Sequence, residues 1–181
     1  MNERVFSRDA ARLRDKTRTE MLEIDRVAGL SLEKIEINSV LDVGTGTAVF
    51  AEVFAKRGLS VAGIDIKNEM VNEAKRLLPE GDFRVGSAEK IPYDDGSFDL
   101  VFLGHVLHET DDTTKALSEA RRVARKRVVV LEWPYVEEKL GPPLAHRLRP
   151  DQVIDSAKRA GYKNIEDIPL KHMVLYRMDI S

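Results

Sequence analysis

The stretch VLDVGTGTAVFAEVFAKRG, residues 40–58, decides the fold of this chain. An apolar run interrupted by Asp42 passes through Gly44 and Gly46 into an amphipathic segment, a pattern that predicts a buried strand, a tight turn and a helix. The glycines permit backbone conformations closed to other residues and let a ligand approach the main chain. Because the N–H groups at a helix start attract polar groups, we expect a polar ligand over this turn, with Asp42 suited to an ammonium group or a water.

Short apolar runs alternate with longer amphipathic segments after residue 38, the pattern of an α/β fold. We expect strands at SVLDV (39–43), SVAGID (60–65), DFRV (82–85), FDLVFL (98–103), RVVVLEW (127–133), NIEDIPL (164–170) and HMVLYRM (172–178). The first five are nearly continuous in apolar residues, which predicts a parallel sheet covered by helices on both faces. The last two strands have no helix between them, so we expect the last to be antiparallel to its neighbours.

Asp65 follows Gly46 by nineteen residues, at the end of the second predicted strand. A carboxylate at this place can accept hydrogen bonds from both hydroxyls of a ribose, so the spacing indicates a nucleoside ligand. The third glycine of the dinucleotide fingerprint is replaced by Val49, which disfavours NAD, and the chain contains no phosphate-binding P-loop motif.

Composition limits the function classes further. The chain has 181 residues, enough for one domain, and its 29 Lys and Arg against 31 Asp and Glu give a net charge of -2, which disfavours nucleic acid as a partner. It contains no cysteine, which excludes disulfides, thiolate metal sites and cysteine nucleophiles. No apolar run is long enough for a membrane span and no His or carboxylate pair has metal-ligand spacing. We therefore expect a cytoplasmic protein with no metal.

The run Asp42, Gly44, Gly46 and Asp65 resembles motif I and the following acidic position of the class I S-adenosylmethionine-dependent methyltransferases. The segments at 86–110 and 116–133 are similar to later elements of that family, and LRPDQVIDSAKRAGYKNI (148–165) is similar to the branch that includes the ubiquinone and menaquinone biosynthesis methyltransferases. The resemblance covers residues 38–178. It implies a Rossmann-like, seven-stranded, mostly parallel sheet of order 3-2-1-4-5-7-6 with strand 7 antiparallel.

The resemblance also implies a cofactor site for S-adenosylmethionine. Its cofactor-binding residues would be Asp42, Gly44 and Gly46 at the methionine part, Asp65 at the ribose, Ile66, Ser87 and Ala88 at the adenine, and Gly104, whose carbonyl would receive the amino group. The chain departs from the family pattern in two places. Ala48 stands where a third glycine is common, and Ser87 stands where an aspartate often contacts adenine.

Two residues are candidate catalytic groups on the acceptor side. His105 directly follows the fourth strand, where the family often directs a side chain toward the methyl group; the alternative is a structural histidine. Glu132 ends the fifth strand and either orients an acceptor or pairs with a basic neighbour. The pattern favours a helix-start role for His108 over catalysis. A base would help an acceptor that is a carbon acid, a phenol or a protonated amine.

These observations predict a single domain, with a helical lid at residues 1–37 and a core at 38–178, that transfers a methyl group to a small-molecule acceptor by in-line displacement. The helical pattern at 8–30 fits a lid and fits a helix packed on the sheet equally well. The basic run RRVARKR (121–127) lies where a helix ends and a strand begins, which favours a solvated helix end over an RNA site. A non-catalytic adenosylmethionine-binding sensor or partner subunit remains an alternative, and a nicotinamide-dependent oxidoreductase is a weaker one.

Overall fold

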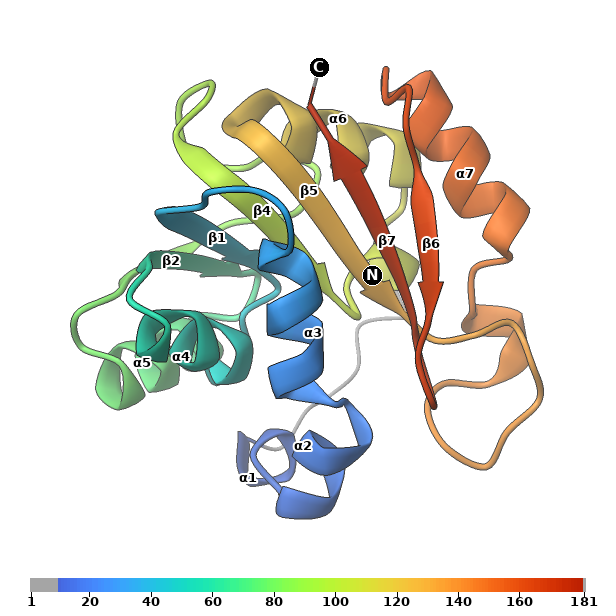
Figure 1. Ribbon diagram of the computed structural model, residues 1–181. Helices are drawn as coiled ribbons and strands as arrows, with labels where there is room; N and C mark the ends of the chain where they lie inside the picture. The colour runs from blue at the N-terminus through green and yellow to red at the C-terminus, as the bar shows by residue number, and fades with distance from the viewer. Residues whose placement is uncertain (1–9, 181) are drawn as a thin grey trace.

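The computed structural model describes residues 10–180, which form a seven-stranded sheet with helices on both faces (Figure 1). The strands are β1 (Ser39–Val43), β2 (Ser60–Asp65), β3 (Asp82–Val85), β4 (Phe98–Gly104), β5 (Ala124–Glu132), β6 (Glu166–Pro169) and β7 (Val174–Asp179). Their order is β3-β2-β1-β4-β5-β7-β6. The first five strands are parallel, and β7 runs antiparallel to both β5 and β6. The predicted fold class is therefore confirmed.

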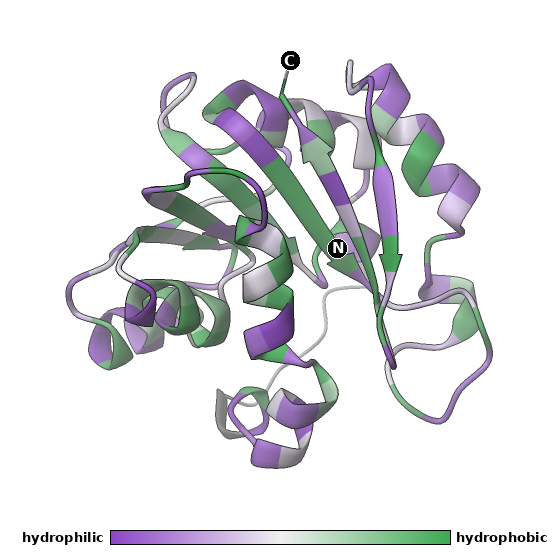
Figure 2. Ribbon diagram, viewed as in Figure 1, coloured by the Kyte–Doolittle hydropathy of each residue, from purple (hydrophilic) through white to green (hydrophobic). Residues whose placement is uncertain are grey.

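Two hydrophobic layers enclose the sheet. Helices α3 (Ile24–Leu32), α4 (Val49–Lys56) and α5 (Asn68–Leu77) cover one face, while α6 (Thr113–Val123) and α7 (Pro150–Arg159) cover the other (Figure 1). Two short 3-10 helices, η1 (Leu107–Glu109) and η2 (Leu144–His146), lie in the connections. Figure 2 shows the central strands β1, β4 and β5 mostly hydrophobic and the helices divided into apolar and polar sides. This division is what amphipathic crossover helices on a buried parallel sheet require.

Strand β3 differs from the expectation that the first five strands are buried on both faces. Of its four residues only Phe83 is buried, because β3 is the edge strand of the sheet and pairs with β2 alone. The sequence DFRV has the right length for a strand, but its alternation of polar and apolar residues matches a strand covered on one side.

The N-terminal helical region is broken into three pieces rather than formed by one helix. Its described part consists of α1 (Ala10–Leu13), α2 (Lys16–Met21) and α3; residues 1–9, which include the start of the predicted lid and of the 8–30 helical pattern, lie outside the described residues. Asp15 caps α2 by accepting a hydrogen bond from the N–H of Arg18, and Glu23 has a left-handed backbone before α3. These local signals separate the helices.

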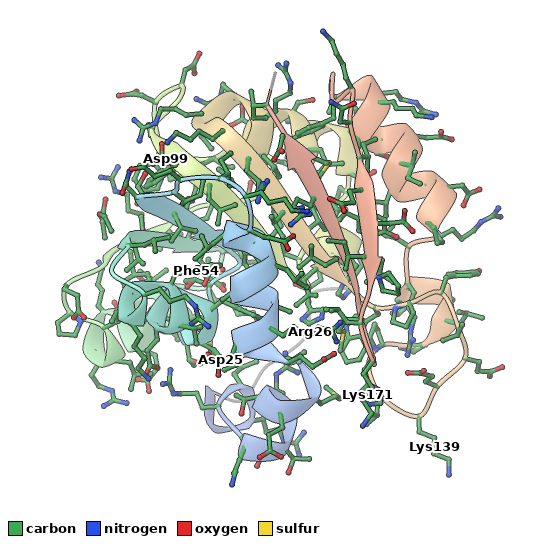
Figure 3. All side chains as sticks on the ribbon, in the orientation of Figure 1. Asp25, Arg26, Phe54, Asp99, Lys139 and Lys171 are labelled. Carbon is green, nitrogen blue, oxygen red and sulfur yellow. The ribbon has the colours of Figure 1, made fainter. Side chains whose placement is uncertain are left out.

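Contacts from two parts of the chain hold the α2–α3 junction. Asp25 forms an ion pair with Arg57 at the end of α4, and the carboxylate of Glu23 accepts the backbone N–H of Lys171 in the β6–β7 connection. Figure 3 shows Asp25 near the base of α3 and Lys171 at the tip of the β6–β7 hairpin. These two contacts therefore attach the N-terminal helices to the end of α4 and to the β6–β7 connection.

Among the described residues, no helix combines the length and apolar character needed to cross a membrane.

Phe54 fixes α4, and with it the turn that precedes this helix, against the sheet. Its ring is fully buried and meets Phe102 of β4 edge-on at 5.5 Å between ring centroids. We predict that Phe54→Ala lowers the free energy of unfolding by about 3–5 kcal/mol through lost burial and a residual cavity. Denaturant unfolding would measure this, with Val136→Ala on an exposed loop as the control; equal small losses in both variants would contradict the packing role.

Candidate functional site

The turn after β1 is held against the end of β2 by its own backbone. The N–H groups of Gly44 and Thr45 both donate to the carbonyl of Ile64 at 2.9 Å. Gly44 and Gly46 have positive φ angles of 71° and 52°. A Cβ on Gly44 would lie 2.9 Å from a methyl carbon of Val106, closer than real contacts allow. Glycine is therefore required at this turn both by conformation and by space.

Asp65 is bound to the same turn through its carboxylate. One oxygen accepts the N–H of Gly46 at 3.0 Å and the other accepts the N–H of Lys67 at 2.9 Å. The carboxylate is half-buried, and each of its oxygens retains further acceptor capacity. The predicted relation between the glycine turn and Asp65 is therefore a direct hydrogen bond in the structure.

A cavity of about 290 Å³ opens beside this turn. It is lined by Gly44, Gly46, Asp65, Ile66, Lys67, Met70, Gly86, Ser87, Ala88, Glu89, Val106, Glu109, Thr110 and Asp111. Six of the eight predicted cofactor-binding residues belong to this lining: Gly44, Gly46, Asp65, Ile66, Ser87 and Ala88. Its position at the carboxyl ends of β1, β2 and β4 is where open α/β sheets bind ligands.

The other two predicted cofactor-binding residues, Asp42 and Gly104, are not part of the described cavity lining. Asp42 lies one layer deeper at the end of β1 and accepts a hydrogen bond from the Thr45 hydroxyl at 2.8 Å. Burial raises the pKa of Asp42 to about 7, and the nearby negative charge of Asp65 adds to that increase. Gly104 ends β4 in close contact with the rings of Phe102 and Phe50.

The residues present fit a nucleoside ligand with a charged tail. Ile66 exposes half of its surface, although large apolar side chains are usually covered, and it lines the cavity beside the Asp65 carboxylate. Within the described part of the chain, the buried hydroxyl of Thr47 in the glycine turn has no hydrogen-bond partner. A buried polar atom of this kind is ordinarily satisfied by water or a ligand. An exposed apolar side chain next to a carboxylate with spare acceptor capacity, at one cavity, fits the adenine and ribose of an adenosine-containing cofactor.

The two predicted catalytic residues are buried at the carboxyl ends of β4 and β5. His105 has a positive φ of 55° directly after β4, and its Nε2 lies 3.1 Å from the sulfur of Met173 while its ring packs against Trp133. Glu132 is buried at the end of β5, and one of its oxygens lies 2.8 Å from Nδ1 of His108. Neither side chain is among the described residues that line the cavity.

The sequence did not predict eight of the lining residues as part of the site, namely Lys67, Met70, Gly86, Glu89, Val106, Glu109, Thr110 and Asp111, nor the contacts that three residues make with the glycine turn. Val106 covers Gly44, and Leu13 of α1 approaches Gly46, where a Cβ would lie 3.0 Å from a methyl carbon of Leu13. Arg14 donates to the carbonyl of Thr47 at 2.8 Å and pairs with Glu52 of α4. No short sequence pattern predicts these contacts, because they join residues that are more than thirty positions apart.

Comparison with known proteins assigns this geometry to a family. A family model described as a methyltransferase domain matches residues 41–131. A demethylmenaquinone methyltransferase of Thermotoga maritima is 34% identical over 111 residues, which are 59% of this chain and 48% of that protein. One from Renibacterium salmoninarum is 37% identical over 98 residues, 53% of this chain and 41% of that protein. The chain thus spans less than half the length of these two curated relatives.

Solved structures agree with the sequence comparison. A SAM-dependent methyltransferase from Aquifex aeolicus superposes with a TM-score of 0.82 at 26% identity, covering 95% of this chain and 97% of that chain. A protein from Pyrococcus horikoshii has the same fold, with a TM-score of 0.76 at 19% identity over 98% of this chain and 97% of that one.

The raised pKa of Asp42 makes a stability prediction. Because the folded-state pKa of about 7 lies above the ordinary aspartate value of 3.8, the native state binds the proton more tightly, and stability is lost as the pH rises through about 7. We predict that the free energy of unfolding of the wild type, relative to Asp42→Asn, falls by up to about 4 kcal/mol between pH 4 and pH 8.

Denaturant titrations across this pH range measure that difference. The control is Asp151→Asn, since hydrogen bonds from Arg149 lower the pKa of this exposed carboxyl and give a small trend of opposite sign. A difference between wild type and Asp42→Asn that does not change with pH would show that Asp42 is ionised in the folded protein throughout.

Proposed function

Because this chain belongs to the methyltransferase domain family and has the sheet order of the class I S-adenosylmethionine-dependent enzymes, we propose that it transfers a methyl group to a small-molecule acceptor. The resemblance to the menaquinone-biosynthesis branch is confirmed by its curated relatives, and S-adenosylmethionine is the cofactor of the family. The observation that carries the proposal is the glycine turn bonded to Asp65 at the mouth of the cavity.

In the proposed cofactor site, the carboxylate of Asp65 would accept hydrogen bonds from the ribose hydroxyls, and Ile66, Ser87 and Ala88 would contact the adenine. The turn of Gly44 and Gly46, with Asp42 beneath it, would hold the methionine part, and the carbonyl of Gly104 would accept a hydrogen bond from its amino group. The bound cofactor supplies a methyl group on a positively charged sulfur. The cavity lining favours this charge, because it contains four carboxylate residues, Asp65, Glu89, Glu109 and Asp111, against Lys67.

The residues of the chain contribute alignment and exclusion of water. In-line displacement needs the nucleophile, the methyl carbon and the sulfur in a row, so positioning accounts for most of the acceleration. We place His105 and Glu132 on the acceptor side of this line. We also propose that the N-terminal helices act as a lid, since Leu13 approaches Gly46 and Arg14 binds both the glycine turn and Glu52 of α4.

A small organic acceptor is favoured over a polyanion. Most basic residues of the 121–127 run are engaged within the protein: Arg122 pairs with Glu119 and Asp95, Arg125 with Asp99, and Arg127 with Asp179. The curated relatives are named for methylation of demethylmenaquinone, so a naphthoquinol is the first acceptor class to test.

Asp65→Asn tests the cofactor site. We expect calorimetry to show S-adenosylmethionine binding to the wild type and a dissociation constant raised roughly 10- to 100-fold in the variant, because charge-assisted hydrogen bonds to the ribose are weakened. The matched control is Asp94→Asn on an exposed loop, which should bind as the wild type does. Unchanged affinity in Asp65→Asn would remove the ribose contact, and no binding to the wild type would refute the proposed function.

Catalysis is tested by the formation of S-adenosylhomocysteine with a panel of acceptors. We expect turnover with a phenolic acceptor such as 1,4-dihydroxynaphthalene and expect His105→Ala to lower turnover more than cofactor affinity. Mass spectrometry of the product identifies the methylated atom. Tight cofactor binding without methylation of any phenol, carbon acid or amine would instead favour a non-catalytic adenosylmethionine-binding protein of the same fold.

A further inference from the structure

A buried histidine and glutamate, His108 and Glu132, form a pair at the carboxyl ends of β4 and β5. His108 lies in η1, just after β4, and exposes 7% of its surface, while Glu132 exposes 2%. Nδ1 of His108 lies 2.8 Å from one carboxylate oxygen of Glu132 and 3.1 Å from the other. Two residues that are 24 positions apart in the sequence are therefore joined at the edge of the sheet that carries the cavity.

The backbone strengthens this pair. The N–H of His108 also donates to Glu132 at 3.1 Å, and the N–H of Trp133 donates to the other oxygen at 3.3 Å. Since both oxygens of Glu132 already act as hydrogen-bond acceptors toward the backbone, we assign the ring hydrogen to Nδ1, where it can donate to the same carboxyl group. The lone pair of the neutral imidazole is then on Nε2.

His108 itself is not among the described residues that line the cavity, and the link from its ring to that lining is Nε2. It lies 4.0 Å from a carboxylate oxygen of Glu109, and Glu109 lines the cavity together with Val106 of the same connection. A row of side chains thus runs from the buried Glu132 through His108 to Glu109, which lines the cavity.

We propose that His108 accepts the proton of the methyl acceptor and that Glu132 is the positioning residue that fixes its tautomer. This inference rests on the proposed methyl transfer. The nucleophilic atom of the acceptor bonds to the methyl carbon, the methyl–sulfur bond breaks with its electron pair passing to sulfur, and the acceptor's proton passes to Nε2. The imidazolium ion that forms is stabilised by Glu132 on one side and Glu109 on the other.

Several ionisable groups lie around the pair. Glu132 comes from β5 and Glu109 from η1; Tyr176 of β7 is near enough to Glu132 that, after burial and the charge of Asp167, this carboxylate helps to raise the pKa of the phenol to about 12. His105 follows β4, and Asp111 and Glu89 line the nearby cavity. Asp112 faces its own helix, where it caps α6 by accepting the N–H of Lys115.

Nitrogen NMR of the full chain, loaded with S-adenosylhomocysteine, tests the positioning role. The chain contains four histidines, so His108→Gln identifies the His108 ring signal, and His146→Gln at an exposed site is the matched control. We expect the Nδ1–H tautomer in the wild type and a His108 pKa lowered by about one unit or more in Glu132→Gln, which keeps the shape but loses the charge. A Nε2–H tautomer, or an unchanged pKa in Glu132→Gln, would overturn the role of Glu132.

Turnover of the phenolic acceptor against pH tests the proton transfer. We expect the acidic limb of kcat/KM to move with the NMR pKa in Glu132→Gln, and His108→Gly to lose at least about tenfold in rate, regained with added imidazole. Glu80→Gln, an exposed change of the same kind, should retain the wild-type profile. A wild-type profile in His108→Gln with intact cofactor binding would contradict this inference alone, whereas absent cofactor binding in the wild type would contradict the proposed function.

Discussion

The hydrogen bond from the Gly46 N–H to the Asp65 carboxylate joins the glycine turn after β1 to the end of β2. The geometry of the candidate site depends on this bond. With the two N–H groups that meet the Ile64 carbonyl, it fixes the turn after β1 to the end of β2. These bonds form because the parallel strands β1 and β2 end at the same edge of the sheet. The turn that leaves β1 therefore reaches a carbonyl near the end of β2. They set where α4 begins and which backbone atoms face the cavity.

Two buried carboxylates at this edge are in contrasting environments. Burial raises the pKa of Asp42 to about 7 and the nearby negative charge of Asp65 adds to the increase, while the hydrogen bond from the Thr45 hydroxyl opposes it. Glu132 accepts two backbone N–H groups, and one of its oxygens lies 2.8 Å from Nδ1 of His108. The acid at the end of β1 can therefore hold a proton near neutral pH, while the acid at the end of β5 is joined to a histidine and to two backbone donors.

The sequence predicted the elements whose information is local. Strands β1, β2, β4 and β5 are buried on both faces and read as apolar runs, and the spacing of Gly44, Gly46 and Asp65 reflects the length of one strand–helix–strand unit. Two further features of the structure also have local signals in the sequence. These are the one-sided burial of β3, which its alternating residues match, and the breaks between helices at Asp15 and Glu23. The contacts of Leu13 with Gly46 and of His108 with Glu132 depend on tertiary packing, which a single sequence does not encode in any short pattern.

The backbone conformation of His105 explains how the distant pair is brought together. A left-handed residue other than glycine costs about 1–2 kcal/mol, and His105 adopts it at the point where β4 ends. The backbone N–H of His105 still donates a hydrogen bond to the carbonyl of Leu131, so the pairing of β4 with β5 continues to the point where the chain turns. The turn starts η1 directly over the end of β5, where both the backbone and the ring of His108 reach Glu132. The strain at His105 is thus offset by the bonds it allows at Glu132, and a strained conformation of this kind persists where the surrounding structure requires it.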